Sequence, residues 1–225
     1  MGRFKHAHPR GVVPLKVLGF REVLPSGGQR IKIGDFWADL SLDGRHNAIN
    51  AVGVHELARR LGVDDVGVAA VFRTLEPPAM RFVRHSIDGV LVIDDTYNAN
   101  PESMRASLET FAEVAATAER RVVVLGAMHE LGPASESLHL EIGALAAGIA
   151  DELVLVGEPE ATWMQRGARA KEFAGRVTTS VDVAAATAFL EPRVRRGDAI
   201  LLKGSRRVSL EIMVRGLIKP GEVRA

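Results

Sequence analysis

The 225-residue sequence contains no cysteine, which excludes disulfides and thiolate metal sites and is typical of a reducing cytoplasm. It also has no excess charge of one sign, since 29 basic and 28 acidic residues leave a formal net charge of +1. The net charge therefore does not indicate binding to nucleic acid or to a membrane surface. No apolar run is long enough for a membrane span, and the first residues lack the apolar core of a signal peptide. We predict a soluble cytoplasmic protein that binds neither nucleic acid nor membranes.

Two common phosphate-binding motifs are missing as well. Neither G-x-G-x-x-G nor G-x-x-x-x-G-K-[ST] occurs in the sequence. The backbone N–H groups of such loops hold phosphates in many nucleotide-binding proteins. Lys203-Gly204-Ser205 is too short for the second motif, and it follows the last predicted strand instead of the first. The sequence thus predicts no phosphate cradle of either type.

The Pro77-Pro78 pair is the clearest boundary in the sequence. Before it, alternating apolar residues between Val12 and Leu42 predict short strands with a hairpin, and helices are predicted over 46–61 and 66–75. For the first helix we assign the buried face to a set of five apolar residues. They are Ile49, Val52, Val54, Leu57 and Leu61.

After the boundary, strands and helices alternate regularly. The predicted strands are 82–85, 90–93, 122–125, 153–156, a weak one near Val177, and 199–202. The predicted helices are 101–116, 135–149, 161–173, 182–190 and 210–218. Asp88-Gly89 predicts a hairpin between the first two strands. Short, wholly apolar strands between helices indicate an α/β, Rossmann-like, doubly wound and mostly parallel sheet covered on both faces.

The segment Val92 to Ser103 joins a strand end to a helix start. Asp94 and Asp95 end the strand, a polar loop follows, and Pro101 opens the helix. Ligands of open α/β sheets bind at this end of the strands. Adjacent acids could hold Mg²⁺, but neighbours on a strand point to opposite faces. We therefore assign Asp95 to the ligand and leave Asp94 structural.

A second informative string is Gly44 to Asn50, at the start of the first predicted helix. Asn47 and Asn50 lie three residues apart, so their amides point the same way. An amide both donates and accepts hydrogen bonds, as recognition of the edge of an adenine requires. The alternative is that Asn47 only caps the helix.

These strings together resemble the Mur ligases, ATP-dependent enzymes of peptidoglycan synthesis. The resemblance rests on four strings: 44–50, 92–103, 125–132 and 203–206. It extends from about residue 12 to residue 218 and corresponds to the last part of such a ligase. It implies that residues 1–77 are the β/α tail of the ATP-binding central domain and that residues 78–225 are the C-terminal Rossmann-like domain.

The resemblance also implies roles for individual residues. Asn47 and Asn50 would contact the adenine, Arg81 the nucleotide phosphates and Asp95 the ribose. The planar guanidinium of Arg suits phosphate because it forms two parallel bonds. The incoming dipeptide would lie near a group of polar residues on two loops. They are Tyr97, Asn98, Asn100, Ser103, Lys203 and Ser205.

Five further positions are informative. Three depart from the usual family pattern: Met80 and Arg207 replace Gly, and Ala127 replaces Asp. His129 and His139 could act as general acid or base. Lone histidines in such positions are far more often structural, and the resemblance requires no histidine base. We therefore assign no catalytic residue.

The members that this chain resembles most activate the carboxylate of UDP-muramoyl tripeptide with ATP, as an acyl phosphate. The amine of D-alanyl-D-alanine then attacks. The cofactor implied is ATP, with Mg²⁺ in the complete enzyme and its ligands expected upstream of this chain. Three hypotheses remain open: a part of such a ligase that needs a partner chain with the P-loop, a non-catalytic nucleotide- or peptide-binding module, and an unrelated doubly wound transferase.

Overall fold

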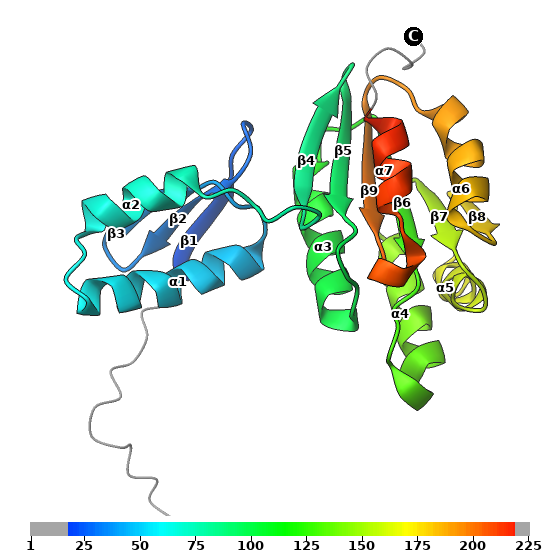
Figure 1. The fold of residues 1–225 in the computed structure, drawn as a ribbon, viewed down its shortest axis with the longest axis horizontal. Coiled ribbons are helices and arrows are strands. Elements are labelled where there is room, and N and C mark those ends of the chain that lie inside the picture. Colours follow the sequence, from blue (N-terminus) through cyan, green and yellow to red (C-terminus); the bar gives the residue numbers. More distant parts are fainter. Residues whose placement is uncertain (1–17, 219–225) are drawn as a thin grey trace, which may run out of the picture. The chain divides into compact units, whose positions relative to one another are not determined.

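The computed structural model describes residues 18–218, which belong to two compact units, Met1–Leu75 and Glu76–Ala225. We call them unit 1 and unit 2 (Figure 1). Each has its own hydrophobic core. The division falls just before Pro77-Pro78. The part of the predicted β region that precedes Leu18 lies outside the described residues.

Unit 1 combines a small antiparallel sheet with two helices. The sheet has the order β1-β2-β3, with β1 (Leu18–Val23), β2 (Gln29–Ile33) and β3 (Phe36–Leu40). The helices are α1 (Arg45–Arg60) and α2 (Asp65–Thr74). Strands β2 and β3 bury every second residue against the helices, as the alternating pattern predicts. These strands and helices confirm the predicted elements.

The predicted buried face of α1 was wrong. The residues that pack on the sheet are Ala48, Ala51, Val52 and His55. Of the five predicted core residues only Val52 is buried, while the other four are more than half exposed. Helix α1 is apolar on two sides, and small Ala side chains allow the closer approach to the sheet. Hydrophobic periodicity alone selected the side with the larger side chains.

His55 ties the two helices of unit 1 together. Its fully buried ring stacks on Phe36 with 4.4 Å between the ring centroids. His55 Nε2 lies 3.0 Å from Oδ1 of Asp65, to which Arg59 Nη1 also donates at 2.7 Å. The bonds from His55 and Arg59 hold the pKa of Asp65 below its usual value of 3.8. The first residue of α2 is thereby bound to the last turns of α1.

The sheet of unit 2 has the strand order β4-β5-β9-β6-β7-β8. Its strands are β4 (Val83–Ile87), β5 (Val90–Asp95), β6 (Arg120–Gly126), β7 (Glu152–Val156), β8 (Arg176–Ser180) and β9 (Asp198–Lys203). Its helices are α3 (Pro101–Val114), α4 (Ser135–Ala147), α5 (Glu160–Arg169), α6 (Val183–Leu190) and α7 (Glu211–Leu217), with short 3-10 turns at Gly132–Ala134, Glu191–Arg193 and Arg206–Val208. Strand β4 runs antiparallel to β5, and the other pairs are parallel. The doubly wound, mostly parallel sheet is confirmed.

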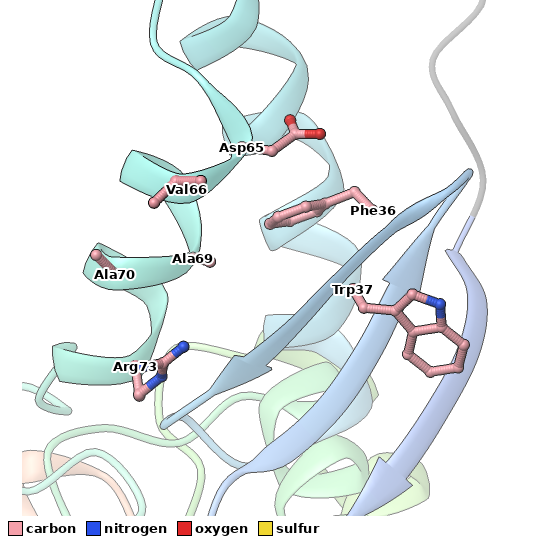
Figure 2. Close-up of a pocket in the computed structure, with 7 residues that line it drawn as sticks. All are labelled: Phe36, Trp37, Asp65, Val66, Ala69, Ala70 and Arg73. Atoms are coloured by element: carbon pink, nitrogen blue, oxygen red, sulfur yellow. The ribbon is translucent and has the colours of Figure 1, made fainter.

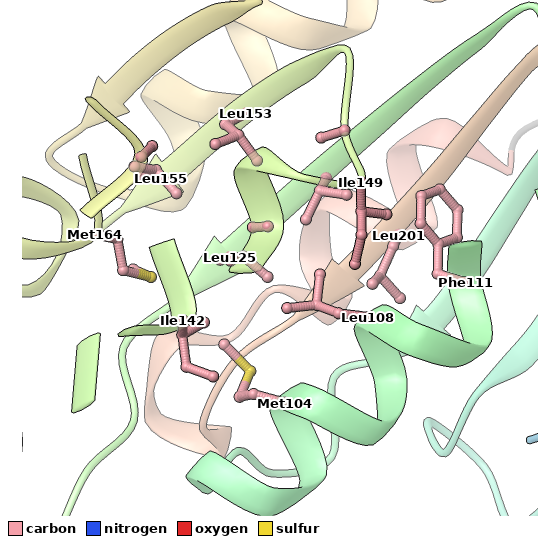
Figure 3. Close-up of a cluster of buried hydrophobic side chains, with 14 of the residues drawn as sticks. Met104, Leu108, Phe111, Leu125, Ile142, Ile149, Leu153, Leu155, Met164 and Leu201 are labelled. Carbon is pink, nitrogen blue, oxygen red and sulfur yellow. The ribbon is translucent and has the colours of Figure 1, made fainter. Parts of the chain in front are cut away.

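Two hydrophobic layers cover the sheet. Helices α3, α4 and α5 pack on one face, where Leu108, Leu125 and Leu201 belong to a continuous core (Figure 3). Helices α6 and α7 pack on the other face, against Val124 and Leu202. Burial on both faces explains why the middle positions of the central strands are all apolar, with charged residues only at the strand ends. In the described residues no helix has the length and apolar character needed to cross a membrane.

The predicted hairpin joins β4 and β5. Asp88 and Gly89 have φ angles of 50° and 81°, as a two-residue turn with both central residues in the left-handed region requires. Strand β4 therefore returns antiparallel along β5 and forms one edge of the sheet.

The connections reverse around β9, the last strand in the sequence. The chain leaves β5 and β6 toward the face of α3 and α4, but it leaves β9 toward the opposite face and α7. Because β9 lies between β5 and β6, a topological switch point flanks it on both sides. Open α/β sheets bind ligands at the carboxyl ends of such strands.

Candidate functional site

The carboxyl ends of β5, β9 and β6 bring together three of the strings singled out in the sequence. Lys203 on β9 is paired with Asp95 on the neighbouring strand β5 and with Leu125 on the neighbouring strand β6. The loops that follow begin at Thr96, Gly204 and Ala127. The candidate site of unit 2 is therefore built at the switch point.

Lys203 and Asp95 form an ion pair at the centre of this edge. Lys203 Nζ lies 2.8 Å from Asp95 Oδ2 and donates to the carbonyl of Asn98 at 3.0 Å. The Lys203 side chain is only 2% exposed and that of Asp95 14%. A buried ammonium requires such partners, because burial without them costs several kcal/mol. This ion pair uses one of the two carboxylate oxygens of Asp95.

Asp94 points to the other face of the sheet and has a different task. Its Oδ1 accepts hydrogen bonds from Thr96 N at 3.2 Å and from Thr96 Oγ1 at 2.6 Å. Thr96 and Asp94 are both buried. The carboxylate thus closes the turn after β5, in agreement with the structural role predicted from strand alternation.

Asn100 and Ser103 form a capping box at the start of α3. Asn100 Oδ1 accepts from Ser103 N at 2.8 Å, and Asn100 N donates to Ser103 Oγ at 3.1 Å. Pro101 occupies the first helical turn, as predicted. Both side chains therefore satisfy the backbone of the helix start. Their predicted contact with substrate stays a prediction.

Arg81 and Tyr97 lie against each other beside this loop. The guanidinium of Arg81 stands 4.4 Å from the centroid of the Tyr97 ring, in a cation–π contact. Tyr97 N donates to the carbonyl of Met80 at 3.0 Å. Met80 and Phe82 both have positive φ angles, of 62° and 54°. The residues on both sides of Arg81 thus adopt the left-handed region that favours glycine.

The loops after β9 and β6 pack directly on each other. A Cβ on Gly204 would lie 3.1 Å from Gly126 Cα, and a Cβ on Gly126 would lie 2.8 Å from Val208 Cγ1. Ser205 N donates to the carbonyl of Ala127 at 2.9 Å, and His129 N donates to Ser205 Oγ at 3.1 Å. Ser205 is buried and holds this contact through both its backbone and its hydroxyl.

His139 fixes the same loop from α4, a contact that sequence reasoning did not predict. Its Nε2 accepts from Met128 N at 3.0 Å, and its Nδ1 lies 2.7 Å from the carbonyl of Ser135. This pattern requires the neutral ring with its proton on Nδ1. Burial lowers the pKa of His139 below its ordinary value of 6.5. His139 is a structural residue, as predicted.

The start of α1 in unit 1 carries Asn47 and Asn50. Asn47 Nδ2 donates to the carbonyl of Asp43 at 2.7 Å, and Asn50 is exposed. The N-cap position belongs to Gly44, whose φ is 89°. The alternative that Asn47 is the cap residue is therefore wrong.

Gln29 positions this turn and was not singled out from the sequence. It is fully buried, and its Nε2 donates to the carbonyls of Leu42 at 2.7 Å and Gly44 at 2.9 Å. A Gln at an inward-facing strand position is the signal that could have revealed it. The backbone that precedes Asn47 is thus held by the sheet.

Unit 1 also has a hollow of about 370 Å³ between α2 and β3 (Figure 2). Its lining residues are Phe36, Trp37, Asp65, Val66, Ala69, Ala70 and Arg73. None of the predicted site residues is among them. The Phe36 ring points toward the helices, whereas Trp37 points to the other side of the sheet. Residues 18–218 contain no cluster of three or more His, Asp or Glu able to hold a metal ion.

Comparison with known proteins gives consistent results. The model of the family "Mur ligase, glutamate ligase domain" matches residues 80–206. The UDP-N-acetylmuramoyl-tripeptide–D-alanyl-D-alanine ligase of Mycobacterium leprae is 36% identical over 201 residues, which are 82% of this chain and 39% of that protein. The enzyme of the same name from Escherichia coli K12 is 34% identical over 185 residues, 81% of this chain and 39% of that one.

Solved structures agree with these sequence matches. MurF from Acinetobacter baumannii has a TM-score of 0.76 and 26% identity, over 89% of this chain and 44% of that chain. The complex of MurF from Thermotoga maritima with ADP has a TM-score of 0.74 and 28% identity, over 91% of this chain and 46% of that chain. This chain spans about two-fifths of the length of the curated relatives. Since a family model covers more than half of it and relatives above 30% identity match four-fifths of it, the chain belongs to the Mur ligase family.

Proposed function

We propose that this chain is the C-terminal portion of an ATP-dependent ligase that joins D-alanyl-D-alanine to UDP-N-acetylmuramoyl tripeptide through an acyl phosphate. The observation that carries the proposal is the arrangement at the switch point of unit 2. There the strand end with Asp95, the loop of Tyr97 and Asn98, and the Lys203–Ser205 string meet at one edge. Two relatives bear the name UDP-N-acetylmuramoyl-tripeptide–D-alanyl-D-alanine ligase, and one solved neighbour contains ADP.

In this proposal four residues serve the nucleotide. Asn47 and Asn50 recognise the adenine through amides on one side of α1. Arg81 binds phosphate with an exposed guanidinium that Tyr97 already orients from one side. Asp95 accepts from the ribose with the carboxylate oxygen that Lys203 leaves available.

The incoming dipeptide is proposed to lie along the loop between β5 and α3. Tyr97 and Asn98 are exposed there and present a hydroxyl and an amide. Neutral donors and acceptors suit a zwitterionic dipeptide. Asn100, Ser103 and Ser205 hold the local backbone, so they shape this surface in addition to any direct contact.

Unit 1 is proposed to be the end of the ATP-binding central domain. The P-loop lysine and the Mg²⁺ ligands would then come from a preceding segment or a partner chain, since no G-x-x-x-x-G-K-[ST] string occurs here. ATP activation would depend on that part, and this chain would contribute proximity and orientation. A non-catalytic binding module is the second candidate, favoured by Ala127 in the position where the family usually has Asp.

Two assays test the proposal. The chain alone should neither release phosphate from ATP nor form an amide bond, and adding a chain with the P-loop segment of a relative should restore both. Calorimetry with ADP should show weak binding that Arg81→Ala and Asp95→Ala each reduce about tenfold. Arg169→Ala, an exposed arginine on α5, is the matched control. Ligation by the chain alone, or equal ADP affinity in all variants, would contradict the proposal.

A further inference from the structure

Lys203 is almost fully buried, whereas a residue that binds a diffusing ligand must be accessible to that ligand. Its side chain is 2% exposed, and its ammonium faces inward to the carboxylate of Asp95 and the carbonyl of Asn98. A direct contact with the carboxylate of a substrate would require one of these partners to move away. The contacts of Lys203 point instead to the segment that begins at Asp95.

The two partners of Lys203 are three residues apart on the same turn. Asp95 is the last residue of β5, and Asn98 precedes the helix cap at Asn100. Between them Tyr97 is exposed, and its N–H bonds the carbonyl of Met80. One ammonium therefore holds the inner side of a turn whose outer side carries the exposed groups.

This ammonium also couples the turn to the centre of the sheet. Lys203 ends β9, which is hydrogen-bonded to both β5 and β6. In any other conformation of the turn, the ammonium would lose one or both partners, which is unfavourable because the Lys203 side chain is only 2% exposed. The sheet therefore favours one conformation of residues 95–98.

We propose that Lys203 is a positioning residue, which acts by fixing the carboxylate of Asp95 and the carbonyl of Asn98 and thereby preorganises the loop that bears Tyr97 and Asn98. Such preorganisation lowers the entropy lost when a ligand binds. The identity of that ligand rests on the proposed function, whereas the ordering of the loop does not.

The first experiment measures the ligand-free chain. Amide hydrogen exchange should be at least about tenfold faster at Tyr97 in Lys203→Met than in the wild type, while the amides of β6 and β7 remain protected. Lys171→Met, the same change at an exposed position, should leave Tyr97 unchanged. Equal exchange at Tyr97 in Lys203→Met and the wild type would overturn the proposal. If Lys203→Met does not fold, Asp95→Asn, which keeps the shape of its side chain, supplies the same comparison.

The second experiment separates positioning from direct contact. ADP affinity is measured for Lys203→Met, Asp95→Asn and the double variant. If Lys203 acts through Asp95, the loss in the double variant is smaller than the product of the two single losses. Losses that multiply fully would overturn the proposal, because Lys203 would then act on the ligand independently. A wild-type chain that binds no ADP would refute the nucleotide role of the site, and amide exchange alone would then decide the role of Lys203.

Discussion

Individual polar residues in this protein mostly satisfy the backbone of neighbouring loops. Gln29 bonds the turn before α1, Asp94 closes the turn after β5, and His139 bonds the backbone of Met128. Each of these side chains is buried, so each needs its partners in order to avoid a desolvation penalty. The conformation of the candidate loops therefore depends on residues that do not themselves face a ligand.

His139 gives a pH prediction at the residue scale. Its pKa in the folded protein is depressed, so below its ordinary value of 6.5 the unfolded state binds the proton more readily. Its contribution to stability is thus complete above pH 6.5 and is lost as the pH falls through the folded pKa. Urea unfolding, followed by the fluorescence of Trp163 in a Trp37→Phe background, should show unit 2 losing stability over this range.

The control for this prediction is His139→Gln, whose amide oxygen can still accept from Met128 N but does not titrate. We expect it to be about 1–3 kcal/mol less stable near neutral pH, because the bond to Ser135 is lost. Its stability should fall less steeply below pH 6.5 than that of the wild type. Parallel pH profiles of the two proteins would contradict the assignment.

At the scale of elements, the two edges of the unit 2 sheet have different chemistry. The carboxyl edge carries the loops of the candidate site. At the amino edge, Arg120 donates to Asp198 at 3.0 and 2.5 Å and to Glu152 at 3.0 Å, which links the starts of β6, β9 and β7. Asp198 and Glu152 are almost fully buried, and the bond to Asp198 raises the pKa of Arg120 above its usual value.

Arg120→Met should strongly destabilise unit 2. Removing the guanidinium leaves buried Asp198 without its cation and buried Glu152 with only Arg176, at 4.0 Å, which costs about 3–5 kcal/mol. The neighbouring Arg121→Met removes a more exposed pair with Asp151 and should cost less than about 1 kcal/mol. The free energies of unfolding of both variants are compared by urea unfolding, followed by the fluorescence of Trp163. Similar losses in the two variants would show that the buried network is not stabilising.

At the scale of the whole molecule, exposed apolar residues concentrate in one unit. Of twelve large hydrophobic residues that are exposed in the described structure, nine belong to unit 1 and three to unit 2. Val54, Leu57 and the C-cap residue Leu61 follow one side of α1 at intervals of three and four residues, opposite its buried face. Such a contiguous apolar stripe favours association with another protein surface.

We expect the purified chain to self-associate through this stripe. Sedimentation velocity should show a mass that rises with concentration, and Leu57→Glu with Leu61→Glu should shift the chain to monomer. The matched control is Val181→Glu with Ile212→Glu, which changes two exposed apolar residues of unit 2. A wild-type chain that stays monomeric at all concentrations would contradict the expectation.

The amino-acid sequence by itself determined the elements, the mostly parallel sheet and the family. The middle of a strand buried on both faces is apolar, and Asp88-Gly89, Pro101 and Pro77-Pro78 act locally, so these signals can be read without tertiary information. Strand alternation likewise predicted that Asp94 and Asp95 point to opposite faces of the sheet, and the two carboxylates have different partners.

Only the tertiary structure decided which side of α1 is buried and what the polar residues contact. Both sides of α1 are apolar, and the sheet selects the small residues Ala48 and Ala51 because they allow closer packing. Lys203 reaches Asn98 from a position 105 residues away in sequence. No local pattern records such a contact, since it follows from the insertion of β9 between β5 and β6.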